Sequence, residues 1–170
     1  LKSVLRPFIR TYIADEDENL VTGDWSALEL RLNALVTGDE AMLKLFTDYD
    51  SGKGLKPHVI NAAIVFGLKA EPELEHKYPH QYRAAKVLIY AVGYGGGPHT
   101  IFDKMLEEEP NLKWEEFLIC FDRIKKAYPT FFKNQLETVL LGSMQHYLDS
   151  PVLKRRVHYH ELVRKNDTDS

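Results

Sequence analysis

Residues 79–98 read PHQYRAAKVLIYAVGYGGGP, and this stretch predicts a helix of about four turns. Pro79 suits the first turn of a helix, because the N–H group that proline lacks would have no partner there. The three glycines at 95–97, followed by Pro98, are typical of the end of a helix. The stretch therefore predicts one long helix whose start and end are both marked in the sequence.

Four side chains of this helix are expected to share one face. At about 100° per residue, the positions of Arg83, Lys86, Tyr90 and Tyr94 fall within a sector of roughly 80°. Guanidinium and ammonium groups bind phosphate oxygens, and a tyrosine ring stacks on a base or sugar. The stripe therefore indicates a nucleotide-binding face. The alternative is an ordinary amphipathic helix with half-buried tyrosines and solvated cations, and the stripe alone leaves both interpretations open.

The rest of the chain also favours helices. Helical spacing with proline or glycine punctuation predicts further helices at about 39–46, 57–66, 99–108, 113–127 and 130–147. The acidic run at 107–109 is interpreted as a solvated helix end, and the basic tail at 151–170 as a hairpin. The predicted fold class is α+β, and mostly helical.

The segment NLVTGDWS at 19–26 is expected to be extended at first and then to enter a helix that ends at Gly38. Leu28, Leu32 and Leu35 are expected to form the apolar face of this helix. Asp39 is expected to cap the next helix.

Asp24 would then stand where the extended segment ends. A carboxylate there is a hard oxygen ligand of the kind that magnesium accepts beside substrate phosphates, and nucleotidyl transfer uses two such metals. The residues after Asp24 also have a purely structural interpretation, because Ser26 and Glu29 have the spacing of a capping box. Both interpretations stay open at this point.

Composition narrows the classes of protein. The formal net charge of −3 gives no overall basic field, so any contact with nucleic acid must come from a local patch. The single cysteine, Cys120, excludes an internal disulfide and suggests a reducing compartment. No apolar run approaches the roughly 20 residues of a membrane-spanning helix. We therefore expect a cytoplasmic protein, in the host cytoplasm if a phage encodes it, with no membrane partner.

Three stretches together resemble the family A DNA polymerases, the group of bacterial DNA polymerase I and many phage replicative enzymes. DWSALELRLNALVTGDEAML at 24–43 is similar to motif A of that family, and RAAKVLIYAVGYGGG at 83–97 is similar to its motif B. Between them, KPHVINAAIVFGL at 56–68 looks like the family's histidine-bearing helix. The resemblance covers roughly residues 15–105 and implies the fingers and part of the palm of a right-hand polymerase.

For the catalytic end of the site, the resemblance implies a metal centre. Asp24 would be the catalytic carboxylate that binds Mg²⁺, and the carbonyl oxygen of Trp25 would join the metal shell. Glu29 would be the steric gate that rejects a ribose 2′-hydroxyl, paired with Tyr94.

For the incoming nucleotide, the resemblance implies the predicted helix face. His58, Arg83 and Lys86 would bind the phosphates, and Lys86 is also a candidate proton donor to pyrophosphate. Tyr90 would pack on the sugar and base of the nucleotide. Gly95, at the end of the helix, would contact DNA.

The sequence departs from the family pattern at several positions. The family places an arginine four residues before the lysine, where this chain has Tyr82, with its arginine one residue later at Arg83. A polar glutamine is usual where Ala27 stands. The family also has a second catalytic aspartate in a downstream His-Asp-Glu hairpin, and VHYHE at 157–161 lacks one.

These departures shape the expected organisation and function. We expect a partial palm at 1–38, helical fingers at 39–150 and the basic tail at 151–170, with the thumb and the second aspartate supplied by another segment. The first hypothesis is a piece of a DNA-directed DNA polymerase that uses primer-template DNA, deoxynucleoside triphosphates and Mg²⁺. The alternative is a helical module that binds nucleotide or DNA without catalysis.

Overall fold

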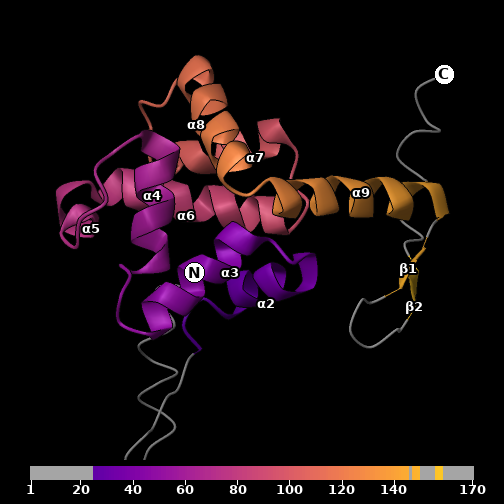
Figure 1. Cartoon of the computed structure of the whole chain (residues 1–170). Helices are drawn as coiled ribbons and strands as arrows, with labels where there is room; N and C mark the ends of the chain where they lie inside the picture. The colour runs from indigo at the N-terminus through magenta and orange to yellow at the C-terminus, as the bar shows by residue number, and fades with distance from the viewer. Residues whose placement is uncertain (1–24, 146, 150–155, 159–170) are drawn as a thin grey trace, which may run out of the picture.

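The structure, a computed structural model, describes residues 25–145, 147–149 and 156–158, which form eight helices and two short strands (Figure 1). In chain order the elements are α2 (Leu28–Thr37), α3 (Glu40–Asp50), α4 (Pro57–Phe66), α5 (Leu74–Lys77), α6 (Pro79–Gly93), α7 (Pro98–Leu106), α8 (Trp114–Ala127), α9 (Pro129–Gln145), β1 (Tyr147–Asp149) and β2 (Arg156–His158).

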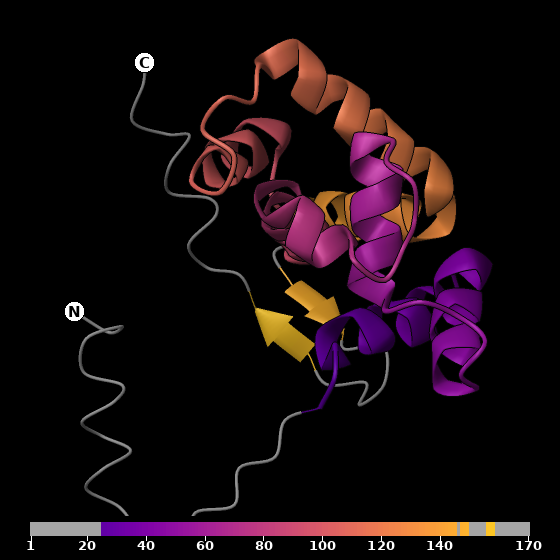
Figure 2. The ribbon, with the colours of Figure 1, turned by 90° about the vertical axis from the view of Figure 1, so that its left-hand side faces the viewer.

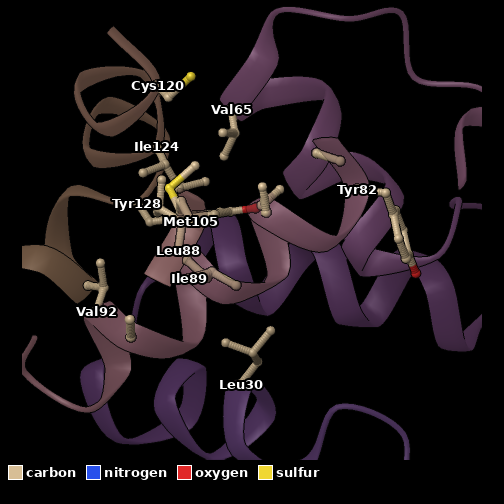
Figure 3. Packing of buried hydrophobic residues seen from close by; sticks show 14 of the residues in the cluster. Leu30, Val65, Tyr82, Leu88, Ile89, Val92, Met105, Cys120, Ile124 and Tyr128 are labelled. Atoms are coloured by element: carbon tan, nitrogen blue, oxygen red, sulfur yellow. The ribbon is translucent and has the colours of Figure 1, made fainter. Parts of the chain in front are cut away.

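Helix α6 lies at the centre of the helical body. In Figure 1 it crosses the middle of the molecule, with α7 and α8 above it and α2 and α3 below. The rotated view in Figure 2 shows the same order, with the orange α8 at the top and the indigo α2 and α3 at the bottom. Leu88 and Ile89 of α6 are fully buried, and Figure 3 shows them in a core that Val65 of α4 and Ile124 of α8 also enter.

Local signals set most of the helix ends, as the sequence predicts. Pro57 and Pro79 stand in the first turns of α4 and α6. Gly38 and Gly67 end α2 and α4, each with a φ of 66°. This is the left-handed region, where a residue with a Cβ is strained. The predicted helices at 99–108, 113–127 and 130–147 are confirmed as α7, α8 and α9, with bounds that agree within two residues.

Asp39 joins two helices that are far apart in the sequence. Its carboxylate accepts a hydrogen bond from the N–H of Met42, so the predicted cap of α3 is confirmed. The other carboxylate oxygen accepts bonds from the N–H groups of Thr130 and Phe131, in the first turn of α9, at 3.1 and 3.0 Å. Asp39 is almost fully buried. Three N–H groups that have no partner within their own helices are thus satisfied by one side chain.

The expected apolar face of α2 is wrong. Leu28, Leu32 and Leu35 are 44%, 50% and 67% exposed, whereas Leu30 and Ala34 are completely buried. The side of α2 that carries Leu30 and Ala34 is covered because α2 packs against α3, α9 and α6, and its approach to α6 is close: a Cβ added to Gly93 would lie 2.7 Å from the side-chain amide nitrogen of Asn33. Alanine and glycine permit such an approach, and the larger leucines are left on the outer side of α2.

The capping box at the start of α2 is also wrong. Ala27, in the left-handed conformation with a φ of 52°, is the N-cap, and no side chain caps the helix. Glu29 instead accepts a hydrogen bond from Tyr94, 65 residues further along the chain. A capping box needs the Glu29 carboxylate to turn back to its own helix, and the bond to Tyr94 holds it elsewhere.

The fold class is helical in the part that the structure describes, apart from one short strand pair. β1 and β2 are antiparallel, with Tyr147 opposite His158, so a hairpin is present, although its first strand begins before residue 151. The extended segment expected just before Asp24 lies outside the described residues. The short helix α5 was not expected from the sequence. No described helix is both long and apolar enough to cross a bilayer.

Candidate functional site

The stripe of α6 lines one wall of a hollow. This hollow, called here the α6 hollow, has a volume of about 470 Å³ and lies between α6 and the residues of α7 and of the turn that follows it. Its polar and aromatic lining consists of Arg83, Lys86, Tyr90, Tyr94, Lys104 and Glu108. The four side chains that the sequence places within one sector therefore do meet at one concave surface.

The hollow has an excess of positive charge. Arg83, Lys86 and Lys104 contribute three cations against the single carboxylate of Glu108. Glu108 binds Arg83 with an Nε–Oε2 distance of 2.7 Å. Among the described residues, neither Lys86 nor Lys104 has a carboxylate within ion-pair distance. Two ammonium groups are thus available to an anionic ligand.

Lys86 also affects His58, a partly buried histidine next to Tyr90. The hydroxyl of Tyr90 lies 3.4 Å from Nε2 of His58. Burial is the main cause that lowers the pKa of His58 to about 4, and the nearby charge of Lys86 lowers it further, against an opposite effect of Glu75. His58 is therefore neutral at neutral pH. It can exchange hydrogen bonds with Tyr90 or a ligand, but it brings no positive charge to a phosphate.

Tyr94 and Glu29 form the predicted pair. The Tyr94 hydroxyl donates a hydrogen bond of 2.6 Å to Oε1 of Glu29. This bond is the main cause that raises the pKa of Tyr94, because the carboxylate stabilises the protonated phenol. The contact brings the start of α2 to the rim of the α6 hollow. The role of Glu29 as a steric gate stays a prediction.

Gly95 faces a second, larger hollow of about 900 Å³. This hollow, called here the lysine hollow, lies between the end of α6, α8 and α9. Its lining includes Gly95, Phe121, Lys125, Lys126, Phe132 and Lys133. Gly95 has a φ of 74°, which favours glycine at this turn. Tyr94 and Gly95 are consecutive, so the turn after α6 contributes to the lining of both hollows.

Sequence reasoning missed two groups of lining residues. Lys104 and Glu108 join the α6 hollow, although the acidic run at 107–109 was expected to be only a solvated helix end. The lysines of α8 and α9 join the lysine hollow. In the sequence, the only indication of these lysines is that cations recur near aromatic residues on two successive helices. That pattern indicates a shared surface only when the two helices are known to lie side by side.

The predicted metal ligands are not tested by the geometry. Asp24 lies outside the described residues, and the side chain of Trp25, the first described residue, is 78% exposed. Within the described ranges, no three His, Cys, Asp or Glu side chains are grouped so that they could hold a metal ion. The metal-binding roles of Asp24 and of the Trp25 carbonyl therefore stay predictions.

Comparison with known proteins points to DNA polymerases. The chain is 31% identical over 120 residues to the thermostable DNA polymerase I of Thermus thermophilus, covering 71% of this chain and 13% of that protein. It is 33% identical over 152 residues to DNA polymerase I of Chloroflexus aurantiacus, covering 89% and 15%. The DNA polymerase of Mycobacterium phage D29 is 28% identical over 149 residues, covering 86% and 22%. No family model matches the chain.

The alignments involve most of this chain and a small part of each relative. The chain spans between 13% and 22% of the length of these three polymerases. Such long alignments at about 30% identity support common ancestry over the aligned segment. The chain is thus a distant homologue of a segment of the family A DNA polymerases.

Proposed function

We propose that this chain is the nucleotide-binding segment of a DNA-directed DNA polymerase. In that reaction the 3′-hydroxyl oxygen of a primer bonds to the α-phosphorus of a deoxynucleoside triphosphate. The bond from the α-phosphorus to its bridging oxygen breaks, and pyrophosphate leaves. The observation that carries the proposal is the α6 hollow, in which Arg83, Lys86 and Tyr90 meet on the segment that is homologous to DNA polymerases.

The cations of the hollow bind the triphosphate. Lys86 and Lys104 offer ammonium groups that have no ion-pair partner among the described residues, and Arg83 can fork onto two phosphate oxygens. Lys86 is also the proposed proton donor to the leaving pyrophosphate, and its position on the wall where the phosphates would lie supports this role.

The aromatic part of the hollow binds the nucleoside. Tyr90 stacks on the sugar and base, while neutral His58 holds the Tyr90 hydroxyl from behind. Glu29 and Tyr94 together limit the space for a ribose 2′-hydroxyl, and their hydrogen bond fixes the carboxylate in that place.

The lysine hollow binds DNA beside the nucleotide. Gly95 lets the backbone approach a base closely, and Lys125 supplies positive charge for the phosphate backbone. Lys126 and Lys133 add to it when they exchange their carboxylate partners, Asp122 and Glu137, for phosphates. Phe121 and Phe132 line the same surface and offer aromatic area for stacking.

Magnesium is proposed from the resemblance alone. Asp24 and the carbonyl of Trp25 would hold Mg²⁺, which when bound stabilises charge on phosphate oxygens. Because the chain spans at most 22% of these three relatives, primer extension is proposed for an assembly that adds a thumb and a second metal-binding aspartate.

A binding experiment tests the nucleotide site on the chain itself. Calorimetric titration of the 170-residue chain with a deoxynucleoside triphosphate should give an affinity that falls about tenfold in Arg83→Ala and in Lys86→Ala, since each loses a charge-assisted contact. Lys53→Ala is the control, because Lys53 is an exposed cation of the turn after α3. Unchanged affinity in both hollow variants would contradict the proposed site.

A second experiment tests catalysis. In an assembly with the additional segments, Asp24→Ala should abolish primer extension in magnesium while part of the nucleotide affinity survives. Persistent extension would contradict the catalytic role of Asp24. Binding that depends on Arg83 and Lys86 but is indifferent to Asp24 and magnesium, with no extension by any assembly, would instead favour a non-catalytic nucleotide-binding module.

A further inference from the structure

One contact in the α6 hollow opposes the binding of a phosphate. The guanidinium of Arg83 is already bound by the carboxylate of Glu108, 25 residues further along the chain, at 2.7 Å. Both side chains line the same hollow. An anion that binds Arg83 must therefore displace the Glu108 carboxylate from the guanidinium or share the guanidinium with it.

The position of Glu108 is fixed by its backbone. Nδ1 of His80, in the first turn of α6, lies 2.8 Å from the carbonyl oxygen of Glu108. The N–H of Glu108 is bonded to the carbonyl of Met105 at 3.1 Å. These contacts hold residue 108 against the start of α6, so the carboxylate is kept within reach of Arg83 when the ion pair opens.

The ion pair is also easy to open. The side chains of Arg83 and Glu108 are 49% and 34% exposed, and ion pairs with this much solvent contribute little net stability. Lys86 and Lys104 lie in the same hollow without a described carboxylate partner, so they can hold an arriving polyphosphate while Arg83 changes partner. A polyphosphate carries several negative charges against the single charge of Glu108.

We propose that Glu108 is an intramolecular competitor for Arg83, which limits how tightly the hollow holds phosphate groups and favours their release. This inference rests on the proposed function, because it requires that the hollow bind polyphosphate through Arg83. In the unbound state Glu108 takes the guanidinium, and in the bound state the phosphate oxygens take it.

The competition makes a quantitative prediction. If Glu108 binds the Arg83 guanidinium part of the time, removing the charge of Glu108 should raise the affinity of any ligand that binds Arg83. The increase in affinity can be at most the equilibrium factor by which the ion pair is favoured. For a half-exposed pair that factor is about 1.5- to fivefold. A ligand that scarcely uses Arg83 should gain less, so inorganic triphosphate should gain more than orthophosphate.

The test uses inorganic triphosphate, pyrophosphate and orthophosphate, titrated calorimetrically into the metal-free 170-residue chain. Glu108→Gln should bind triphosphate about 1.5- to fivefold more tightly than the unmodified chain. Glu107→Gln is the matched control, because Glu107 is an exposed neighbour outside the lining and its loss changes the net charge equally. Circular dichroism checks that each variant is folded.

A double-mutant cycle decides whether the effect passes through Arg83. In an Arg83→Gln background, Glu108→Gln should have no more effect than Glu107→Gln. An equal gain with and without Arg83, or no gain above the Glu107 control, would overturn the competition while leaving the site intact if Lys86→Ala still weakens binding. Triphosphate binding that ignores both Arg83 and Lys86 would overturn the proposed nucleotide site, and the competition with it.

Discussion

The hydroxyl of Tyr94 and the carboxylate of Glu29 are joined by a hydrogen bond of 2.6 Å, which connects the residue after α6 to the first turn of α2. The bond raises the pKa of Tyr94. Glu29→Gln should therefore lower the pKa of Tyr94 toward its ordinary value, since the amide stabilises the protonated phenol less than a carboxylate does. A titration of ring-labelled tyrosines by NMR measures this shift. Glu40→Gln, which removes an exposed acid of α3 instead, is the control and should leave the pKa of Tyr94 raised.

Stability should depend on pH through His58. Its pKa in the folded state is about 4, below the ordinary value of 6.5, so the unfolded chain binds the proton more readily between these values. The contribution of neutral His58 is fully present above pH 6.5 and is lost as the pH falls toward 4. The loss is on the order of 2 kcal/mol after allowance for the partial exposure of the ring.

Urea denaturation at pH 7 and at pH 4.5 measures this contribution. The difference in unfolding free energy between the two pH values should be smaller in His58→Gln than in the unmodified chain. His99→Gln is the control, because His99 is exposed and stacks on Trp114. An equal pH dependence in all three chains would show that His58 is protonated as easily in the folded protein as in the unfolded one.

Asp39 should be among the most sensitive polar positions. Asp39→Ala removes the cap of α3 and leaves the N–H groups of Thr130 and Phe131 without their acceptor. The expected loss is about 3 kcal/mol of unfolding free energy, since capping and buried hydrogen bonds are lost together. Asp122→Ala, which removes a largely exposed partner of Lys126, should change stability by less than about 0.5 kcal/mol. Similar losses in both variants, measured by urea denaturation, would contradict the bridging role of Asp39.

The two sides of α2 should respond differently to substitution. Leu30 is fully buried beneath α6, so Leu30→Ala should lower the unfolding free energy by about 3 kcal/mol. Leu35 is 67% exposed, so Leu35→Gln should change it by less than about 0.5 kcal/mol. Urea denaturation of the isolated chain compares the two. A larger loss of unfolding free energy in the Leu35 variant would contradict this burial pattern and support the apolar face that the sequence pattern indicated.

Features governed by neighbouring residues were predictable from the sequence. The start of α6 at Pro79 and the end of α2 at Gly38 follow from the dihedral angles and hydrogen bonds of a few residues. The shared wall formed by Arg83, Lys86 and Tyr90 follows from helical geometry alone. The resemblance to a polymerase family added the pairing of Glu29 with Tyr94, which lies beyond the reach of local rules.

Features that depend on how helices approach one another were not predictable. The outer leucines of α2 have the same spacing as a buried face, and the side that is covered depends on how α2 packs against α3, α6 and α9. The partner of Arg83 is an acid in a different segment, 25 residues away. The low pKa of His58 depends on burial and on the charge of Lys86, and neither can be obtained from its place in the sequence.

The turn after α6 has a consequence for engineering. Tyr94 borders the α6 hollow and Gly95 borders the lysine hollow, and the two residues share one peptide unit. A substitution that rotates this peptide would move both linings together. If the two hollows bind nucleotide and DNA as proposed, substitutions at these two positions should change both kinds of binding together, and separate control requires substitutions on α2 for the nucleotide and on α8 for DNA.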